Sequence, residues 1–171
     1  MTLARRVVGV LSLDPQTFED IEADKSASGQ ALVVVIAAGV SAGVGALYDD
    51  TAPGLFWVVL GKVIGCAMWA VVTYVLGARL WPEPTTKTDV GELFRVIGFS
   101  YVPDVFSIFG LLPSVGLAIR IVIALWQLAT TVLAVRQALD YRSTWRALAV
   151  VATGWLIFFI TPSIFQYVSA L

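Results

Sequence analysis

Apolar residues along this chain occur in long runs rather than in alternation, and short polar segments separate the runs. Each run holds about 20 residues, the length that an α-helix needs to cross the hydrocarbon core of a bilayer. Membrane β-strands would instead show about 10 residues of alternating polarity. The pattern predicts an all-α integral membrane protein with five transmembrane helices, at about residues 30–48, 55–81, 93–112, 117–135 and 145–168.

Residues 1–29 precede the first run and are predicted to form an N-terminal segment outside the bilayer, with a short amphipathic surface helix, while residues 30–171 form the membrane domain. In LSLDPQTFEDIEADK, Asp14 is a natural N-cap and Pro15 suits the first helical position. Phe18 and Ile21 are three residues apart and share one helix face. This face either packs on the protein's own bundle or docks a partner, and both interpretations stay open.

The third run contains a proline followed by an acid, in the stretch GFSYVPDVFSIFG. Pro103 has no N–H group and disfavours helical geometry at the residue before it, so we predict a kink or a break near Tyr101. In the first run, the spacing of Gly39 and Gly43 permits close contact with another helix.

Composition supports the membrane assignment and narrows the possible chemistry. Hydrophobic residues make up 58% of the chain and charged residues only 13%, against about one quarter in soluble domains. Histidine is absent and Cys66 is the single cysteine, which excludes a disulfide within the chain, the usual His and Cys zinc sites and a histidine base. No basic block suits a nucleic acid. We expect a protein without enzymatic activity, metal or cofactor, whose partners are the lipid bilayer and either another membrane protein or further copies of itself.

Basic residues are distributed unevenly between the two sides of this five-span arrangement. The side of the N-terminus holds nine of the eleven Lys and Arg residues, namely Arg5, Arg6, Lys25, Arg79, Lys87, Arg95, Arg136, Arg142 and Arg146. The segments predicted for the other side, YDDTAPG, LPSVG and QYVSAL, hold none. The positive-inside rule therefore predicts a multi-pass protein of the plasma membrane with a cytoplasmic N-terminus and an external C-terminus.

Three charged residues, Lys62, Asp104 and Arg120, lie inside the apolar runs at more than two residues from either end. At a rise of about 1.5 Å per residue, Lys62 and Asp104 each lie roughly 12 Å from the outer end of their helices, and Arg120 roughly 6 Å. An unpaired charge in the bilayer costs at least about 2.5 kcal/mol, so we predict a cluster built on a Lys62–Asp104 pair. Arg120 either joins the pair or extends toward the headgroups.

This cluster has three possible interpretations. It is a salt bridge that holds helices together, a polar cavity or path for an ion, proton or lipid headgroup, or a set of charges that reach the interface without specific pairing. Hydrogen-bonding groups are available nearby on Ser100, Tyr101, Ser107 and Gln127. The same residue types also pack between membrane helices.

The segment LFRVIGFSYVP, residues 93–103, resembles the YIP family of polytopic membrane proteins, named for interaction with Ypt and Rab GTPases. The resemblance is carried by the spacing of Arg95, Gly98, Ser100, Tyr101 and Pro103. The segment DPQTFEDI, residues 14–21, is similar to the entry helix of the prokaryotic branch. Asp104 departs from the family pattern, in which an apolar residue follows the proline. The resemblance implies a five-span fold and, in eukaryotic members, assembly with GTPases and membrane proteins in vesicle traffic.

These observations predict a prokaryotic YIP-like membrane protein that works as a non-enzymatic scaffold or as an assembly or trafficking-type factor. The alternative is a small transporter, channel or lipid-handling protein that uses an intramembrane polar site at Lys62, Asp104 and Arg120.

Overall fold

The computed structural model describes residues 1–46, 54–112 and 114–169, with side chains described up to Phe158 except those of residues 45 and 46. Within these ranges the chain forms helices and turns and no strand. The helices are α1 (Leu3–Leu11), α2 (Pro15–Ala23), α3 (Ala27–Ala46), α4 (Leu55–Thr73), η1 (Tyr74–Leu80), α5 (Val90–Ser100), η2 (Pro103–Leu111), α6 (Gly116–Ala138) and α7 (Thr144–Ser169). Most of the predicted outer segment 48–54, Pro113 and residues 170–171 lie outside the described residues.

Four stretches are long and apolar enough to cross a membrane. They are Ala27–Val44, Leu55–Leu80, Val90–Leu111 and Gly116–Ala138. The predicted fifth run lies in α7, whose apolar stretch Thr144–Phe158 is shorter than the other four within the described residues. The all-helical fold predicted from the sequence is therefore confirmed for the described residues, with four stretches long and apolar enough to cross a membrane.

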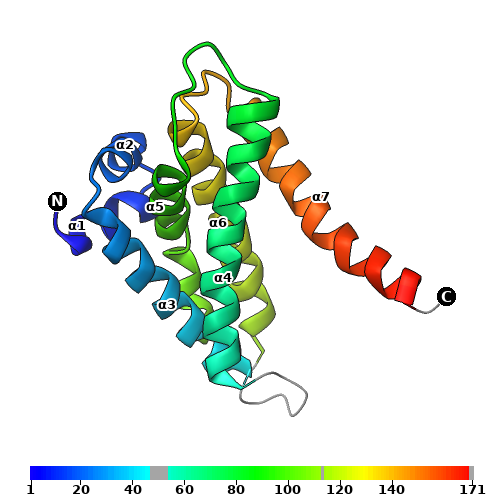
Figure 1. Ribbon diagram of the computed structural model, residues 1–171. Helices are drawn as coiled ribbons and strands as arrows, with labels where there is room; N and C mark the ends of the chain where they lie inside the picture. The colour runs from blue at the N-terminus through cyan, green and yellow to red at the C-terminus, as the bar shows by residue number, and fades with distance from the viewer. Residues whose placement is uncertain (47–53, 113, 170–171) are drawn as a thin grey trace.

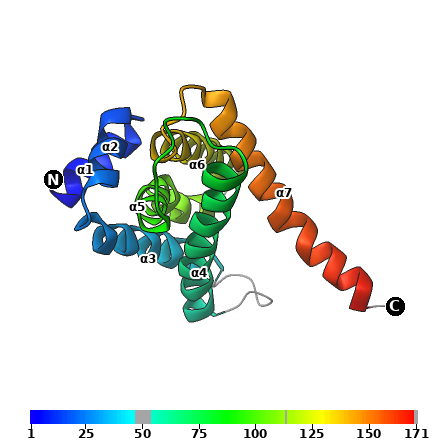
Figure 2. The same ribbon diagram turned by 45° about the horizontal axis from the view of Figure 1, so that its top comes forward.

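The helices surround α5 and η2, which together form the third membrane stretch. Helix α3 packs against α4, α5 and η2, and α6 packs against α5, η2 and α7. Figures 1 and 2 show α1 and α2 at one side of the bundle. In both views, α7 lies next to the bundle at its N-terminal end and moves away from α4 and α6 toward its C-terminal end.

Small residues allow α3 to approach its neighbours closely. A Cβ atom added at Gly39 would lie 3.0 Å from the Cα atom of Val59 on α4. One added at Gly43 would meet the Leu55 side chain at 2.4 Å. The close helix contact predicted from the Gly39 and Gly43 spacing is thus the contact between α3 and α4.

The predicted break at Pro103 is confirmed. Helix α5 ends at Ser100, Tyr101 is its C-cap, and Pro103 begins the 3-10 helix η2. Proline suits this first position because its missing N–H group has no helical partner there. The third membrane stretch is therefore an α-helix followed by a narrower 3-10 helix.

The N-terminal segment contains two helices, of which the sequence predicted only the second. Asp14 caps α2 by accepting a hydrogen bond from the Gln16 amide, and Pro15 is the first helical residue, as predicted. Helix α1 was missed. It is held by Arg6, which is fully buried, forms an ion pair with Asp24 and donates to Gln30 Oε1 at 2.6 Å.

The connections α4–α5 and α6–α7 are joined to each other by polar contacts. The Thr86 hydroxyl donates to the Leu139 carbonyl at 2.7 Å, and Arg146 lies 3.3 Å from Glu83 in an ion pair. The two connections therefore lie at the same end of the bundle, as Figure 1 shows.

Candidate functional site

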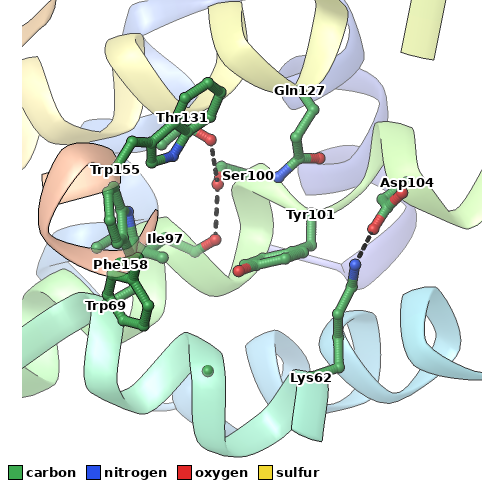
Figure 3. Close-up of a pocket in the computed structure, with 11 residues that line it drawn as sticks. Lys62, Trp69, Ile97, Ser100, Tyr101, Asp104, Gln127, Thr131, Trp155 and Phe158 are labelled. Atoms are coloured by element: carbon green, nitrogen blue, oxygen red, sulfur yellow. Dashed lines mark hydrogen bonds and ion pairs between the residues drawn. The ribbon is translucent and has the colours of Figure 1, made fainter. Parts of the chain in front are cut away.

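A cavity of about 380 Å³ lies among the membrane stretches, between α4, α5, η2, α6 and α7. Its volume falls in the lower part of the range of about 300–1,000 Å³ that is common for small-molecule sites. Eleven residues line it: Lys62, Gly65, Trp69, Ile97, Ser100, Tyr101, Asp104, Gln127, Thr131, Trp155 and Phe158. Figure 3 shows charged side chains at one end and aromatic side chains at the other.

The charged end is formed by Lys62 from α4 and Asp104 from η2, which make an ion pair. The structure thus brings together the two residues that were expected to pair from their depth. Their side chains are 26% and 19% exposed, so the pair remains reachable from the cavity. Lys62 Nζ also lies 5.2 Å from the centre of the Tyr101 ring, in a cation–π contact.

Arg120 is not part of this arrangement. Its side chain is exposed, and its aliphatic part lies over Gly110 at the end of η2. The ion pairs found among the described residues do not include it. This corrects the expectation of a three-residue cluster, because Arg120 lies against Gly110 near the end of η2, whereas Asp104 lies at the start of η2.

Uncharged polar groups occupy the middle of the cavity. The Ser100 hydroxyl donates to the Ile97 carbonyl at 2.8 Å and lies 3.2 Å from the Thr131 hydroxyl. The Oε1 atom of Gln127 is buried without a hydrogen-bond partner. Of the uncharged polar residues that line the cavity, the sequence analysis named Ser100, Tyr101 and Gln127 but not Thr131.

The aromatic end is formed by Trp69 of α4 together with Trp155 and Phe158 of α7. The rings of Trp69 and Phe158 lie 5.5 Å apart with a tilt of 51°. A Cβ atom added at Gly154 would lie 2.7 Å from the Trp69 ring, so glycine is what lets α7 cross α4 here. These aromatic residues were missed because each is unremarkable inside an apolar run.

The residues that carry the family resemblance separate into two groups. Ser100 and Tyr101 line the cavity, and Pro103 starts the helix that positions Asp104. Arg95 is buried elsewhere and donates from Nε and Nη2 to the Glu22 carbonyl at 3.1 and 2.6 Å. At Gly98, an added Cβ atom would lie 2.9 Å from Ala31, so this glycine sets the contact between α5 and α3. Arg95 and Gly98 therefore hold helices together and do not line the cavity.

Phe18 and Ile21 are fully buried against the bundle. They therefore cannot form an exposed face that docks a partner, and that interpretation of the Phe18 and Ile21 face is corrected. The structure agrees with the other interpretation, in which this face of α2 packs on the protein's own bundle. The physical reason is that apolar side chains on a surface helix are most favourably placed against an available core.

Outside the membrane stretches, Glu22 of α2 and Asp24, the C-cap of that helix, have pKa shifts of opposite direction. Burial, followed by the nearby carboxylates of Asp140, Glu19 and Glu92, raises the pKa of Glu22 from 4.5 to about 8. Its Oε2 atom is buried without a hydrogen-bond partner. Hydrogen bonds from Ser26 and Arg6 instead hold the pKa of Asp24 well below its usual value.

The described residues contain no group of three or more acids or cysteines placed to hold a metal ion. The cavity therefore offers one cation, one anion, neutral hydrogen-bonding groups and an aromatic wall.

A comparison with protein-family models matches residues 8–165 to the Yip1 domain. Comparisons with curated proteins and with solved structures found no match. The matched range includes α2, the four long membrane stretches and the whole of the cavity lining.

Proposed function

The chain belongs to the Yip1 family, and on this basis we propose that it is a non-enzymatic membrane scaffold that assembles with a protein partner through the surface of α2. Family membership and the apolar helices make it a multi-pass membrane protein. A scaffold needs a binding surface held in a fixed position, and α2 supplies one.

The proposal includes five crossings, with α7 as the fifth. Residues 1–29 then form the cytoplasmic segment and residues 30–171 the membrane domain. The location of nine of eleven basic residues on one side supports a cytoplasmic N-terminus and an external C-terminus in the plasma membrane of a prokaryote.

The observation that carries the scaffold proposal is the rigid attachment of α2. Phe18 and Ile21 are buried beneath it, Arg95 holds the Glu22 carbonyl, and Gln137 Nε2 donates to Glu19 Oε1 at 2.7 Å. The outer side of α2 therefore presents carboxylates in a fixed orientation. A partner with a basic surface fits this charge.

Absence of enzymatic activity is the second part of the proposal. The sequence contains no histidine, and its single cysteine, Cys66, is buried in α4. A thiol buried in an apolar helix is poorly placed for nucleophilic chemistry.

The proposal is tested with a photo-crosslinking amino acid introduced at Gln16, an exposed position of α2. Irradiation of native membranes is expected to yield a reproducible product with a different protein. The matched control carries the probe at Val8, which is 62% exposed on α1 and is expected to give no such product. The partner is then identified by mass spectrometry.

Charge reversal tests whether the product depends on the acidic surface. Asp20→Lys, which leaves the hydrogen bond between Glu19 and Gln137 intact, is expected to lower its yield at least about tenfold, because opposed like charges cost several kcal/mol. A yield unaffected by charge reversal, a product formed only between copies of this chain, or no product at all contradicts the proposed hetero-partner.

A further inference from the structure

The cavity described above has a polar end and an apolar end, which is the pattern of a site for an amphiphile. Lys62 and Asp104 lie at one end, and Trp69, Trp155 and Phe158 lie at the other (Figure 3). All of these residues belong to helices that form the membrane domain. A lipid is the amphiphile that surrounds such helices at the highest concentration.

The charges of the site select the class of headgroup. Lys62 and Asp104 together are neutral, and Arg120 lies apart from them. A ligand with a single charge would bind one partner and leave the other as an uncompensated charge, which is costly in a site of low dielectric constant. A zwitterion avoids this cost, because its anion binds Lys62 while its cation binds Asp104.

The hydrogen-bonding groups select the kind of cation. Gln127 Oε1 is buried and has no donor, although a buried acceptor normally has one. A primary ammonium group has N–H donors for both this oxygen and the Asp104 carboxylate. A trimethylammonium group has none, and the Tyr101 ring, which lies near the pair and could stack on such a group, is already in a cation–π contact with Lys62.

From these groups we propose that the cavity binds a zwitterionic phospholipid with a primary ammonium headgroup, of the phosphatidylethanolamine type. The phosphate accepts from the Lys62 ammonium group, and the headgroup ammonium donates to Asp104 and to Gln127 Oε1. The glycerol and the upper acyl chains lie against Trp69, Trp155 and Phe158. This inference does not depend on the α2 partner and stands or falls separately from it.

The experiment is native mass spectrometry of the full-length protein in detergent, with phosphatidylethanolamine, phosphatidylcholine and phosphatidylglycerol supplied in equal amounts. We expect at least about tenfold more bound phosphatidylethanolamine than phosphatidylcholine, because phosphatidylcholine makes neither of the two charge-assisted hydrogen bonds and the loss of one alone gives about this ratio. Soluble phosphoethanolamine at the same concentration is expected not to displace the lipid, since it makes no contact with the aromatic end.

Two variants test the polar groups. Gln127→Leu removes an acceptor that has no partner in the empty cavity, so this variant is expected to fold normally and to lose the preference. Asp104→Asn removes the charge that binds the ammonium and is expected to lose it as well. The matched control is Arg120→Gln, which removes a membrane charge outside the cavity and is expected to keep the full preference.

Several results overturn the proposal. Equal binding of phosphatidylethanolamine and phosphatidylcholine removes the role of the N–H donors. Preferential binding of phosphatidylcholine or phosphatidylglycerol assigns the site to another headgroup. A preference that survives in both cavity variants places the lipid elsewhere on the protein, and displacement by soluble phosphoethanolamine assigns the site to a soluble ligand.

Discussion

Breaking the Lys62–Asp104 ion pair is expected to destabilise the protein measurably. Asp104→Asn leaves the Lys62 ammonium group without its anion, although the contact with the Tyr101 ring remains. Loss of one partner costs about 3–5 kcal/mol in a fully buried pair and about 0–1 kcal/mol at an exposed surface. Side-chain exposures of 26% and 19% place this pair between those limits, so we expect a loss of about 1–3 kcal/mol.

A double-mutant cycle separates the pair from its individual residues. For a chain of this size the expected loss lowers Tm by about 2–12 °C. Lys62→Met with Asp104→Leu removes both charges and fills the space with apolar atoms, so the double variant is expected to recover most of the stability. Thermal unfolding of purified protein in lipid-free detergent measures both effects without contributions from bound lipid.

The control for this cycle is Arg120→Gln, which is expected to shift Tm by less than about 1 °C because exposed charges contribute little. The reasoning is refuted if the double variant loses the sum of the two single losses. Additive losses would mean that Lys62 and Asp104 do not interact in the folded protein, whatever their positions.

Three further predictions concern other parts of the molecule. Gly39→Ala is expected to lower the free energy of unfolding by about 1–3 kcal/mol, because the new Cβ atom would press on the backbone of α4. Chemical unfolding measures this loss, and Gly29→Ala, which has open space around it, is the control. Arg6→Met is expected to speed hydrogen exchange in Leu3–Leu11 at least about tenfold, since it removes the bonds to Asp24 and Gln30 that hold α1. The raised pKa of Glu22 means that the native state holds this proton more tightly than the unfolded state, so the free energy of unfolding is expected to fall as pH rises from 4.5 to 8. Thermal melts across that pH window measure the fall, and Glu22→Gln is expected to remove it.

Helix positions along the membrane normal could be predicted from the sequence, but helix rotation could not. Counting residues from the outer ends placed Lys62 and Asp104 at equal depth, and the structure pairs them. The same count placed Arg120 in the same half of the bilayer, yet it lies apart. Depth is set by rise per residue, whereas the direction of a side chain depends on how the helix packs against its neighbours.

Two arginines show why tertiary roles were missed. Arg6 and Arg95 were counted as basic residues of connecting segments, and the count gave a clear asymmetry between the two sides. In the structure both are buried, Arg6 with Asp24 and Arg95 with the Glu22 carbonyl. A charge near the end of an apolar run looks the same in the sequence whether it contacts water or a distant partner.

The π-helical end of the second membrane stretch was missed for a similar reason, because its contacts come from a residue that is distant in the sequence. Residues Tyr74–Leu80 form η1 rather than a continuation of α4. The Tyr141 hydroxyl donates a hydrogen bond that is shared between the Gly77 carbonyl, at 2.9 Å, and the Trp81 carbonyl, at 2.7 Å. Because this partner is more than 60 residues away in the sequence, local pattern predicts only a regular helix here.

The cavity itself depends on how the break at Pro103 is supported. A 3-10 helix has weaker internal hydrogen bonds than an α-helix, and inside a membrane its backbone needs other partners. Ser41 of α3 supplies them, since its hydroxyl donates to the Val105 carbonyl at 2.7 Å and accepts from the Ile108 amide at 3.0 Å. With η2 held in this way, Asp104 at its start faces Lys62 instead of continuing the α-helical path of α5. A single buried serine on a neighbouring helix is therefore part of what places the carboxylate in the cavity.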